Sequence, residues 1–184
     1  MKVDIMTVPH LSNQTRARSR SPRLPPHGKH LARITPGLEP ALVDNTQHTI
    51  ESPDTGEPRS HEIAVAGPAA LLVAKATKIQ ERHVELAAGR KDRARTQGSV
   101  DRLRLLRRIE TDQLIDGFAR HRDGAEAEQV SRHALTYFSD QFVSGDDDEV
   151  CHGILRELDD PVMASSYSAL MDELLASCAH KRFL

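Results

Sequence analysis

The sequence predicts an α+β protein, with strands in the first third of the chain and helices from there onward. Up to residue 66, short runs that favour strands are separated by turn residues. After residue 66, apolar residues recur at helical spacing. A chain of 184 residues that is 38% hydrophobic can form a core. We therefore expect a partial mixed sheet over residues 1–66 and a helical domain over residues 67–184.

Two stretches should supply the strands. Residues 2–8, KVDIMTV, alternate so that Val3 and Ile5 share one face and Asp4 lies on the other. Further along, turn compositions separate short runs at 41–43, 48–51 and 61–66. Because the first strand has nothing before it in the sheet, we expect Val3 and Ile5 to be exposed.

A basic, proline-rich segment lies between these stretches. Six of the ten prolines fall within residues 9–40, and residues 1–40 carry seven Lys or Arg against two acidic side chains. Proline interrupts regular structure, so we expect a loop over about residues 9–38. Its run RARSRSPR can attract RNA through charge alone, and a proline-broken connector is the alternative interpretation.

A helix should begin at Pro68, because proline in the first helical position loses no internal hydrogen bond. At about 100° per residue, its residues Leu72, Ala76 and Ile79 form an apolar stripe. After a charged loop over residues 87–98, a second helix should begin with Ser99 as its N-cap. It should bury an apolar face of its own, made of Val100, Leu103 and Leu106.

Three cations lie beside the apolar stripe of the first helix. Lys75, Lys78 and Arg82 occupy a narrow arc, which is what a phosphate-binding edge requires. Solvated charges that flank a core helix, partly neutralised by Glu81 and Glu85, are the alternative.

Further helices are indicated by apolar spacing in the last third of the chain, over about residues 114–118, 130–142 and 150–158 and from Pro161 onward. The acidic run at 146–149 suits a helix start, since carboxylates there oppose the helix dipole.

The cysteines and the hydropathy indicate in which cellular compartment the protein is expected. Cys151 and Cys178 have no second Cys or His at metal-ligand spacing, so we expect buried hydrophobes in a reducing cytosol. No apolar run reaches the roughly 20 residues that span a bilayer. These features predict a soluble cytoplasmic protein without a membrane partner.

Three stretches in succession, KVDIM, VAGPAALLVAKATKIQER and SVDRLRLLR, resemble the latter half of the AbiEii-type nucleotidyltransferases, a toxin family of toxin–antitoxin systems. The resemblance covers roughly residues 1–8 and 38–110. It implies a nucleotidyltransferase-like sheet followed by helices, and transfer of a nucleotidyl group from a nucleoside triphosphate. In that family a DxD pair and a third carboxylate bind two Mg²⁺ ions that hold the triphosphate.

Particular residues carry this resemblance. Asp4 corresponds to the third carboxylate and would be a metal ligand, Lys75 to the motif lysine with Arg82 seven residues on, and Asp101 to the final aspartate. The resemblance thus implies catalytic roles for Asp4, Lys75 and Asp101, and nucleotide binding by Lys75, Lys78 and Arg82. It also implies a tRNA or protein acceptor and an antitoxin protein as partners.

The chain departs from the family pattern at two places. No glycine-rich motif or DxD pair precedes Asp4, and Gln97 and Gly98 stand where the family has a basic residue and its first aspartate. One carboxylate cannot form a two-metal site, because two divalent cations about 4 Å apart need several anionic ligands. We therefore expect a truncated or degenerate relative that is inactive as this chain.

Two alternatives stay open. One is a non-catalytic binding or regulatory module that uses the cationic helix edge for nucleic acid or a partner protein. The other is an active enzyme whose start codon was placed too late.

Overall fold

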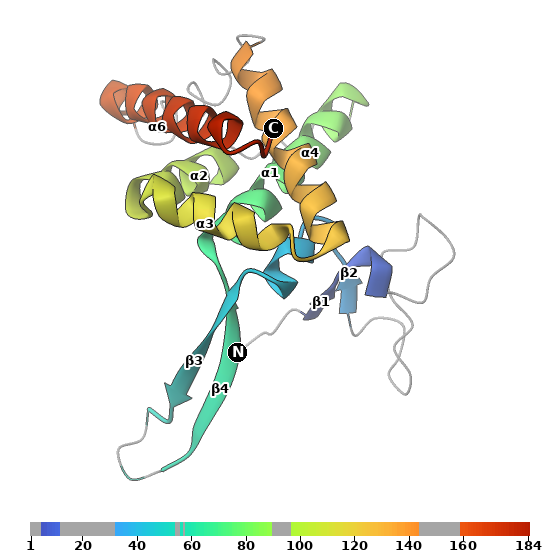
Figure 1. Ribbon diagram of the computed structural model, residues 1–184, viewed down its shortest axis with the longest axis vertical. Coiled ribbons are helices and arrows are strands. Elements are labelled where there is room, and N and C mark those ends of the chain that lie inside the picture. The colour runs from blue at the N-terminus through green and yellow to red at the C-terminus, as the bar shows by residue number, and fades with distance from the viewer. Residues whose placement is uncertain (1–4, 12–31, 54–55, 57, 90–96, 144–158) are drawn as a thin grey trace.

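A computed structural model describes residues 5–11, 32–53, 56, 58–89, 97–143 and 159–184. The helices gather at one end of the molecule, and a long β-hairpin projects away from them (Figure 1). Far more of the described residues are helical than extended, and the strands precede the helices in the chain. The predicted α+β class is confirmed, as is the helical C-terminal half.

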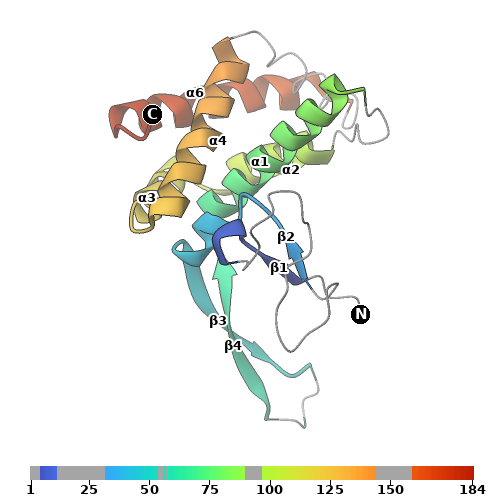
Figure 2. The ribbon, with the colours of Figure 1, turned by 90° about the vertical axis from the view of Figure 1, so that its right-hand side faces the viewer.

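The strands form two separate two-stranded sheets. In one, β1 (Ile5–Thr7) runs parallel to β2 (Ala32–Ile34). In the other, β3 (Asn45–Glu51) pairs antiparallel with β4 (Ser60–Ala66) over the full length of both strands. The second sheet is the projecting hairpin, and Figure 2 shows that it extends away from the helices in a second view as well.

The sheets differ from the predicted single mixed sheet. Residues 41–43, predicted as a strand, fall in and just after a 3₁₀ helix, η2 (Glu39–Leu42), because Pro40 fixes a helical φ and cannot donate to a strand ladder. The partner of β1 is β2, which lies inside the segment expected as a loop, residues 9–38. A short 3₁₀ helix, η1 (Pro9–Leu11), also lies in that segment. Ile5 is exposed as expected, and Val3 lies outside the described residues.

The first long helix, α1 (Pro68–Ala87), begins at the predicted residue. The Gly67 amide donates to the Asp44 carbonyl oxygen at 2.7 Å, and the Gly67 carbonyl accepts from the Leu71 amide at 3.0 Å. A Cβ at Gly67 would overlap the Asp44 side chain, so the close approach requires glycine. These bonds turn the chain from β4 into α1.

The described chain continues after α1 in α2 (Gln97–Arg108), α3 (Thr111–His121), α4 (Ala125–Val143) and α6 (Pro161–His180). The start of α6 is as predicted. Pro161 occupies the first turn, and the Asp160 carboxylate caps the helix by accepting from the amides of Val162 and Met163 at 2.9 and 3.3 Å.

Two helix boundaries differ from the prediction. α1 extends to Ala87, the first residue of the expected loop, and α2 begins at Gln97, two residues before Ser99. Gly98 lies in the first turn of α2, whereas the conformational cost of glycine is greatest in the interior of a helix. The expectations for residues 146–149 and 150–158, which include Cys151, lie outside the described residues.

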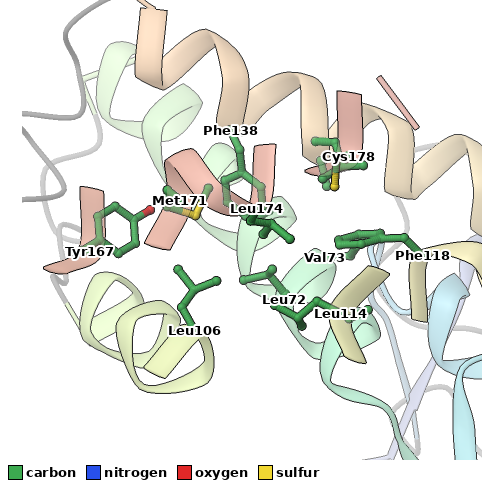
Figure 3. Packing of buried hydrophobic residues seen from close by; sticks show 14 of the residues in the cluster. Leu72, Val73, Leu106, Leu114, Phe118, Phe138, Tyr167, Met171, Leu174 and Cys178 are labelled. Carbon is green, nitrogen blue, oxygen red and sulfur yellow. The ribbon is translucent and has the colours of Figure 1, made fainter. Parts of the chain in front are cut away.

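The helices enclose a hydrophobic core to which each described α-helix contributes (Figure 3). The predicted apolar faces of α1 and α2 are both buried. Its most deeply buried large apolar side chains are Leu72, Leu103, Leu114, Phe118, Leu135, Phe138, Tyr167, Met171 and Leu174. Cys178 is fully buried beside them, and burial raises the pKa of its thiol to about 12, as expected for a cysteine that packs as a small hydrophobe.

Candidate functional site

Helices α1 and α2 bring together two of the residues that the resemblance assigns to catalysis. The ammonium group of Lys75, from the middle of α1, forms an ion pair with the carboxylate of Asp101, from the second turn of α2. Both side chains are partly exposed, 41% for Lys75 and 27% for Asp101. Arg104 Nη1 lies 3.6 Å from the other Asp101 carboxylate oxygen, so two cations share this carboxylate.

The other predicted cations follow on the next turns of α1. Lys78 donates to Glu81 at 2.8 Å, and both side chains are exposed. Arg82 is partly buried. The helical spacing places Lys75, Lys78 and Arg82 on one side of α1, and we call these three residues the cationic edge. The Lys78 pair agrees with the partial neutralisation that the sequence indicated.

The residues described here do not fit a two-metal site. Asp4, the predicted metal ligand, lies outside the described residues. Within the described ranges, no group of three or more His, Cys, Asp and Glu side chains is arranged to hold a metal ion. The Asp101 carboxylate is a ligand type that Mg²⁺ accepts, but it is paired with Lys75 and Arg104. The chemistry that this part of the chain offers is binding of anions by cations.

A second cluster, around Asp44, is not predicted by the sequence. This side chain is 1% exposed. Its Oδ2 accepts from the Ala70 amide in the first turn of α1 at 3.0 Å, and its Oδ1 accepts from Arg120 Nε and Nη2 at 3.1 and 2.6 Å. One carboxylate therefore joins the chain after η2 to both α1 and α3. Its partners are 26 and 76 residues away, and no local pattern signals such contacts.

The surroundings of Asp44 keep it ionised. Burial alone would raise its pKa, but contact with His121 and hydrogen bonds from Arg120 and the Ala70 amide outweigh burial and lower the pKa to about 2. We regard Arg120 as the strongest partner, because His121 Nε2 is 3.4 Å from Oδ2 whereas the guanidinium makes two shorter contacts. Asp44 is thus a buried anion at neutral pH.

His121 connects Asp44 to Ser131 on α4. Ser131 Oγ and His121 Nδ1 lie 2.6 Å apart, and both side chains are buried. The order of hydroxyl, imidazole and carboxylate is that of a nucleophilic triad. However, His121 Nε2 makes no well-formed hydrogen bond within the described part of the chain, and Ser131 is only 4% exposed. We interpret this chain of contacts as a structural link between α3 and α4.

Arg102, next to Asp101 in sequence, is fully buried. Its Nη1 donates to Gln141 Oε1 at 3.3 Å, and its guanidinium lies 5.4 and 5.7 Å from the ring centres of Phe138 and Tyr167. Among the described residues, its Nε and Nη2 have no hydrogen-bond partner. Burial of such a charge is unfavourable, and the two aromatic faces offset part of that cost. The apolar spacing of α2 does not predict that Arg102 is buried.

No family model matches the chain, no curated protein matches it, and no solved structure matches it. In the part of the chain that the structure describes, none of the helices combines the length and apolar character needed to cross a bilayer. The interpretation of the site therefore depends on its residues and their geometry.

Proposed function

We propose that this chain carries the lysine- and aspartate-bearing part of an AbiEii-like nucleotidyltransferase site, and that it binds nucleoside triphosphates through its cationic edge. One observation carries the proposal. Lys75 and Asp101 are 26 residues apart, and their side chains meet between α1 and α2. These are the two positions that the resemblance assigns to the motif lysine and the final aspartate, so the contact supports their assignment to one site.

Each residue has a distinct part in the proposed binding. Lys75, Lys78 and Arg82 donate charged hydrogen bonds to phosphate oxygens. Asp101 holds the Lys75 ammonium against α2 and competes with phosphate for it. Because these side chains are partly exposed and partly paired, binding is weak and decreases with salt. It depends little on Mg²⁺, since the carboxylate beside Lys75 is already paired with cations.

The chain by itself is expected to transfer no nucleotidyl group. Phosphoryl transfer depends mainly on positioning and on neutralising the charge of the reacting phosphates. In the family that the chain resembles, two metal ions held by several carboxylates supply most of that neutralisation. A lysine paired with a single aspartate can assist binding of the triphosphate, but it does not neutralise the charge of the reacting phosphates to the same extent.

Calorimetric titration with nucleoside triphosphates, with and without magnesium, tests the binding. We expect dissociation constants in the millimolar range that change little with magnesium. Lys75→Ala should weaken binding by about fivefold to tenfold, the size expected when one charged hydrogen bond is lost. Arg33→Ala, which removes an exposed cation from β2, is the matched control and should leave the affinity unchanged. Tight magnesium-dependent binding, or an affinity that Lys75→Ala does not alter, would contradict the proposal.

Incubation with labelled nucleoside triphosphates and a pool of tRNA or protein acceptors tests the catalytic part. We expect no labelled product from the 184-residue chain. Adding a segment that bears the DxD pair should confer activity that depends on Asp4. Robust labelling that survives Asp4→Asn would show that the active site lies elsewhere.

A second candidate function is binding of nucleic acid along the same surface. Arg104 favours it, because this exposed side chain extends the cationic edge from α1 onto α2. Binding to a tRNA pool should then weaken linearly with the logarithm of salt concentration, and Lys75→Ala and Arg104→Ala should each reduce the slope by about 1. Absence of binding at low salt would exclude this function.

A further inference from the structure

A small pocket lies away from the cationic edge, between the end of α3, the first half of α4 and the turn after α6. Its volume is about 20 Å³, room for roughly one water molecule, and with its open mouth it encloses about 260 Å³. Phe118, Leu135 and Phe183 provide apolar lining, and His121 and Ser131 provide polar lining. No residue of the cationic edge lines it.

The lining of the pocket is strongly cationic. Three arginines, Arg122, Arg132 and Arg182, line it together with one acidic residue, Glu128. Arg132 Nη2 donates to Glu128 Oε1 at 2.7 Å in an exposed pair along α4. Arg132 is thus paired with Glu128 through Nη2 alone, and the lining holds two more arginines than acidic residues.

Arg122 is already committed to the fold. Its Nη2 donates to the carbonyl oxygens of Lys181 and Arg182 at 3.2 and 2.9 Å, and its guanidinium lies 4.3 Å from the centre of the Phe183 ring. These bonds satisfy carbonyl groups of the turn that follows α6. Arg122 thus fixes the turn that carries Arg182.

Arg182 occupies a backbone position where glycine is normally found. Its φ is 59°, and the two bonds that follow α6, from the Arg182 amide to Ala179 O at 3.1 Å and from the Phe183 amide to Cys178 O at 3.0 Å, form a Schellman motif. An arginine in this left-handed conformation is strained, whereas glycine is not. Within the described ranges, no hydrogen bond or ion pair engages its guanidinium. The side chain at this position therefore contributes charge at the pocket without stabilising the turn.

We propose that this pocket binds a phosphate group, with Arg182 as its main donor and Arg132 as its second. One phosphate oxygen enters the pocket, where the Ser131 hydroxyl lies in the wall, and the remaining oxygens stay at the mouth between the guanidinium groups. Arginine suits this task because its planar donors match the geometry of an oxyanion. The same chemistry serves inorganic phosphate and the terminal group of a phosphomonoester.

Titration of the full chain with inorganic phosphate and with adenosine 5′-monophosphate, at constant ionic strength in chloride and followed by amide chemical shifts, tests this site. We expect shifts centred on residues that line the pocket. Arg182→Gly should weaken binding by about tenfold, as loss of a charged hydrogen bond predicts, while the melting temperature stays the same or rises. Tighter binding of the monophosphate would identify a phosphomonoester as the ligand, and equal binding would identify phosphate itself.

Two control variants distinguish binding of phosphate in the pocket from general electrostatic attraction of phosphate to the protein. Lys181→Ala removes the same charge from the neighbouring residue, whose side chain does not line the pocket, and should leave binding unchanged. Lys75→Ala should also leave it unchanged, which distinguishes this site from the triphosphate site proposed above. The proposal is overturned if phosphate does not bind at millimolar concentration, or if Lys181→Ala weakens binding as much as Arg182→Gly does.

Discussion

Asp44 shows how a single residue can hold several elements together. Its carboxylate caps the start of α1 through the Ala70 amide and pairs with Arg120 on α3. At Gly67 and Gly117 the backbone lies so close to this carboxylate that a Cβ at either position would crowd it. The Asp44 side chain therefore fixes where η2, α1 and α3 meet.

This arrangement predicts a loss of stability in acid. The pKa of Asp44 falls from its ordinary 3.8 to about 2 in the folded state, so folding favours the ionised form. Its contribution to the free energy of unfolding is fully present above about pH 5. It decreases as the pH falls through 4 toward 2, by about 2 kcal/mol in total. Urea unfolding between pH 2 and pH 7 measures this.

Asp44→Asn isolates that contribution. We expect it to lower the free energy of unfolding at pH 7 by about 2 to 3 kcal/mol, because Arg120 loses its charged partner in a buried setting. Its stability should also vary less between pH 2 and pH 5 than that of the unaltered chain. Asp116→Asn, at an exposed carboxylate of α3, is the control and should change neither quantity by much. Equal pH profiles for the unaltered chain and Asp44→Asn would refute this role.

At the level of single residues, the sequence predicts part of the candidate functional site. It assigned Lys75 and Asp101 to one site through a resemblance, and the structure brings them together. It could not indicate Asp44 or Arg102. The partners of Asp44 come from two distant helices, and Arg102 is buried by aromatic rings of α4 and α6 that no pattern within α2 reveals.

Among the elements, α1 and α3 pack closely against each other at Gly117. A Cβ there would lie 2.5 Å from Ala69 Cβ and 3.1 Å from Asp44 Oδ2. The glycine thus allows the two helix backbones to cross over the buried carboxylate. The backbone conformation at Gly117 is one that other residues also adopt. Glycine is needed there because a side chain would not fit between the two helices.

Gly117→Ala should therefore be destabilising, although alanine is the better helix former. Overpacking of this kind costs about 1 to 3 kcal/mol, and the gain in helix propensity is about 1 kcal/mol. We expect a net loss of about 1 to 2 kcal/mol by urea unfolding. Gly56→Ala, whose Cβ would meet nothing within 4 Å, is the control and should be close to neutral. If the two variants are equally stable, the close crossing is not a constraint.

The helices were more predictable than the strands. Apolar residues recur at helical spacing along α1, α2, α4 and α6, so periodicity identifies each of them. In contrast, β2 has three residues and pairs with a strand more than 20 residues before it, which leaves no local signal. Pro40 likewise overrides the strand preference of residues 41–43.

At the scale of the whole molecule, the helical end and the projecting hairpin differ in burial. The helices share a continuous core, whereas β3 and β4 are exposed along nearly their whole length. One face of the hairpin presents Ile50, Ile63 and Val65, all well exposed. The stability of the molecule therefore resides mainly in the helices, and both proposed anion sites lie on them.

The central claim is that Lys75 and Asp101 form one triphosphate-binding site, and a double-mutant cycle of nucleoside triphosphate affinity tests it most directly. Calorimetry would compare the unaltered chain with Lys75→Ala, Asp101→Asn and the double variant. Lys75→Ala should weaken binding, and Asp101→Asn should tighten it severalfold because the competing carboxylate is neutralised. The double variant should bind as weakly as Lys75→Ala, since the effect of Asp101→Asn acts through Lys75. Additive effects of the two substitutions, or weaker binding by Asp101→Asn, would contradict the claim.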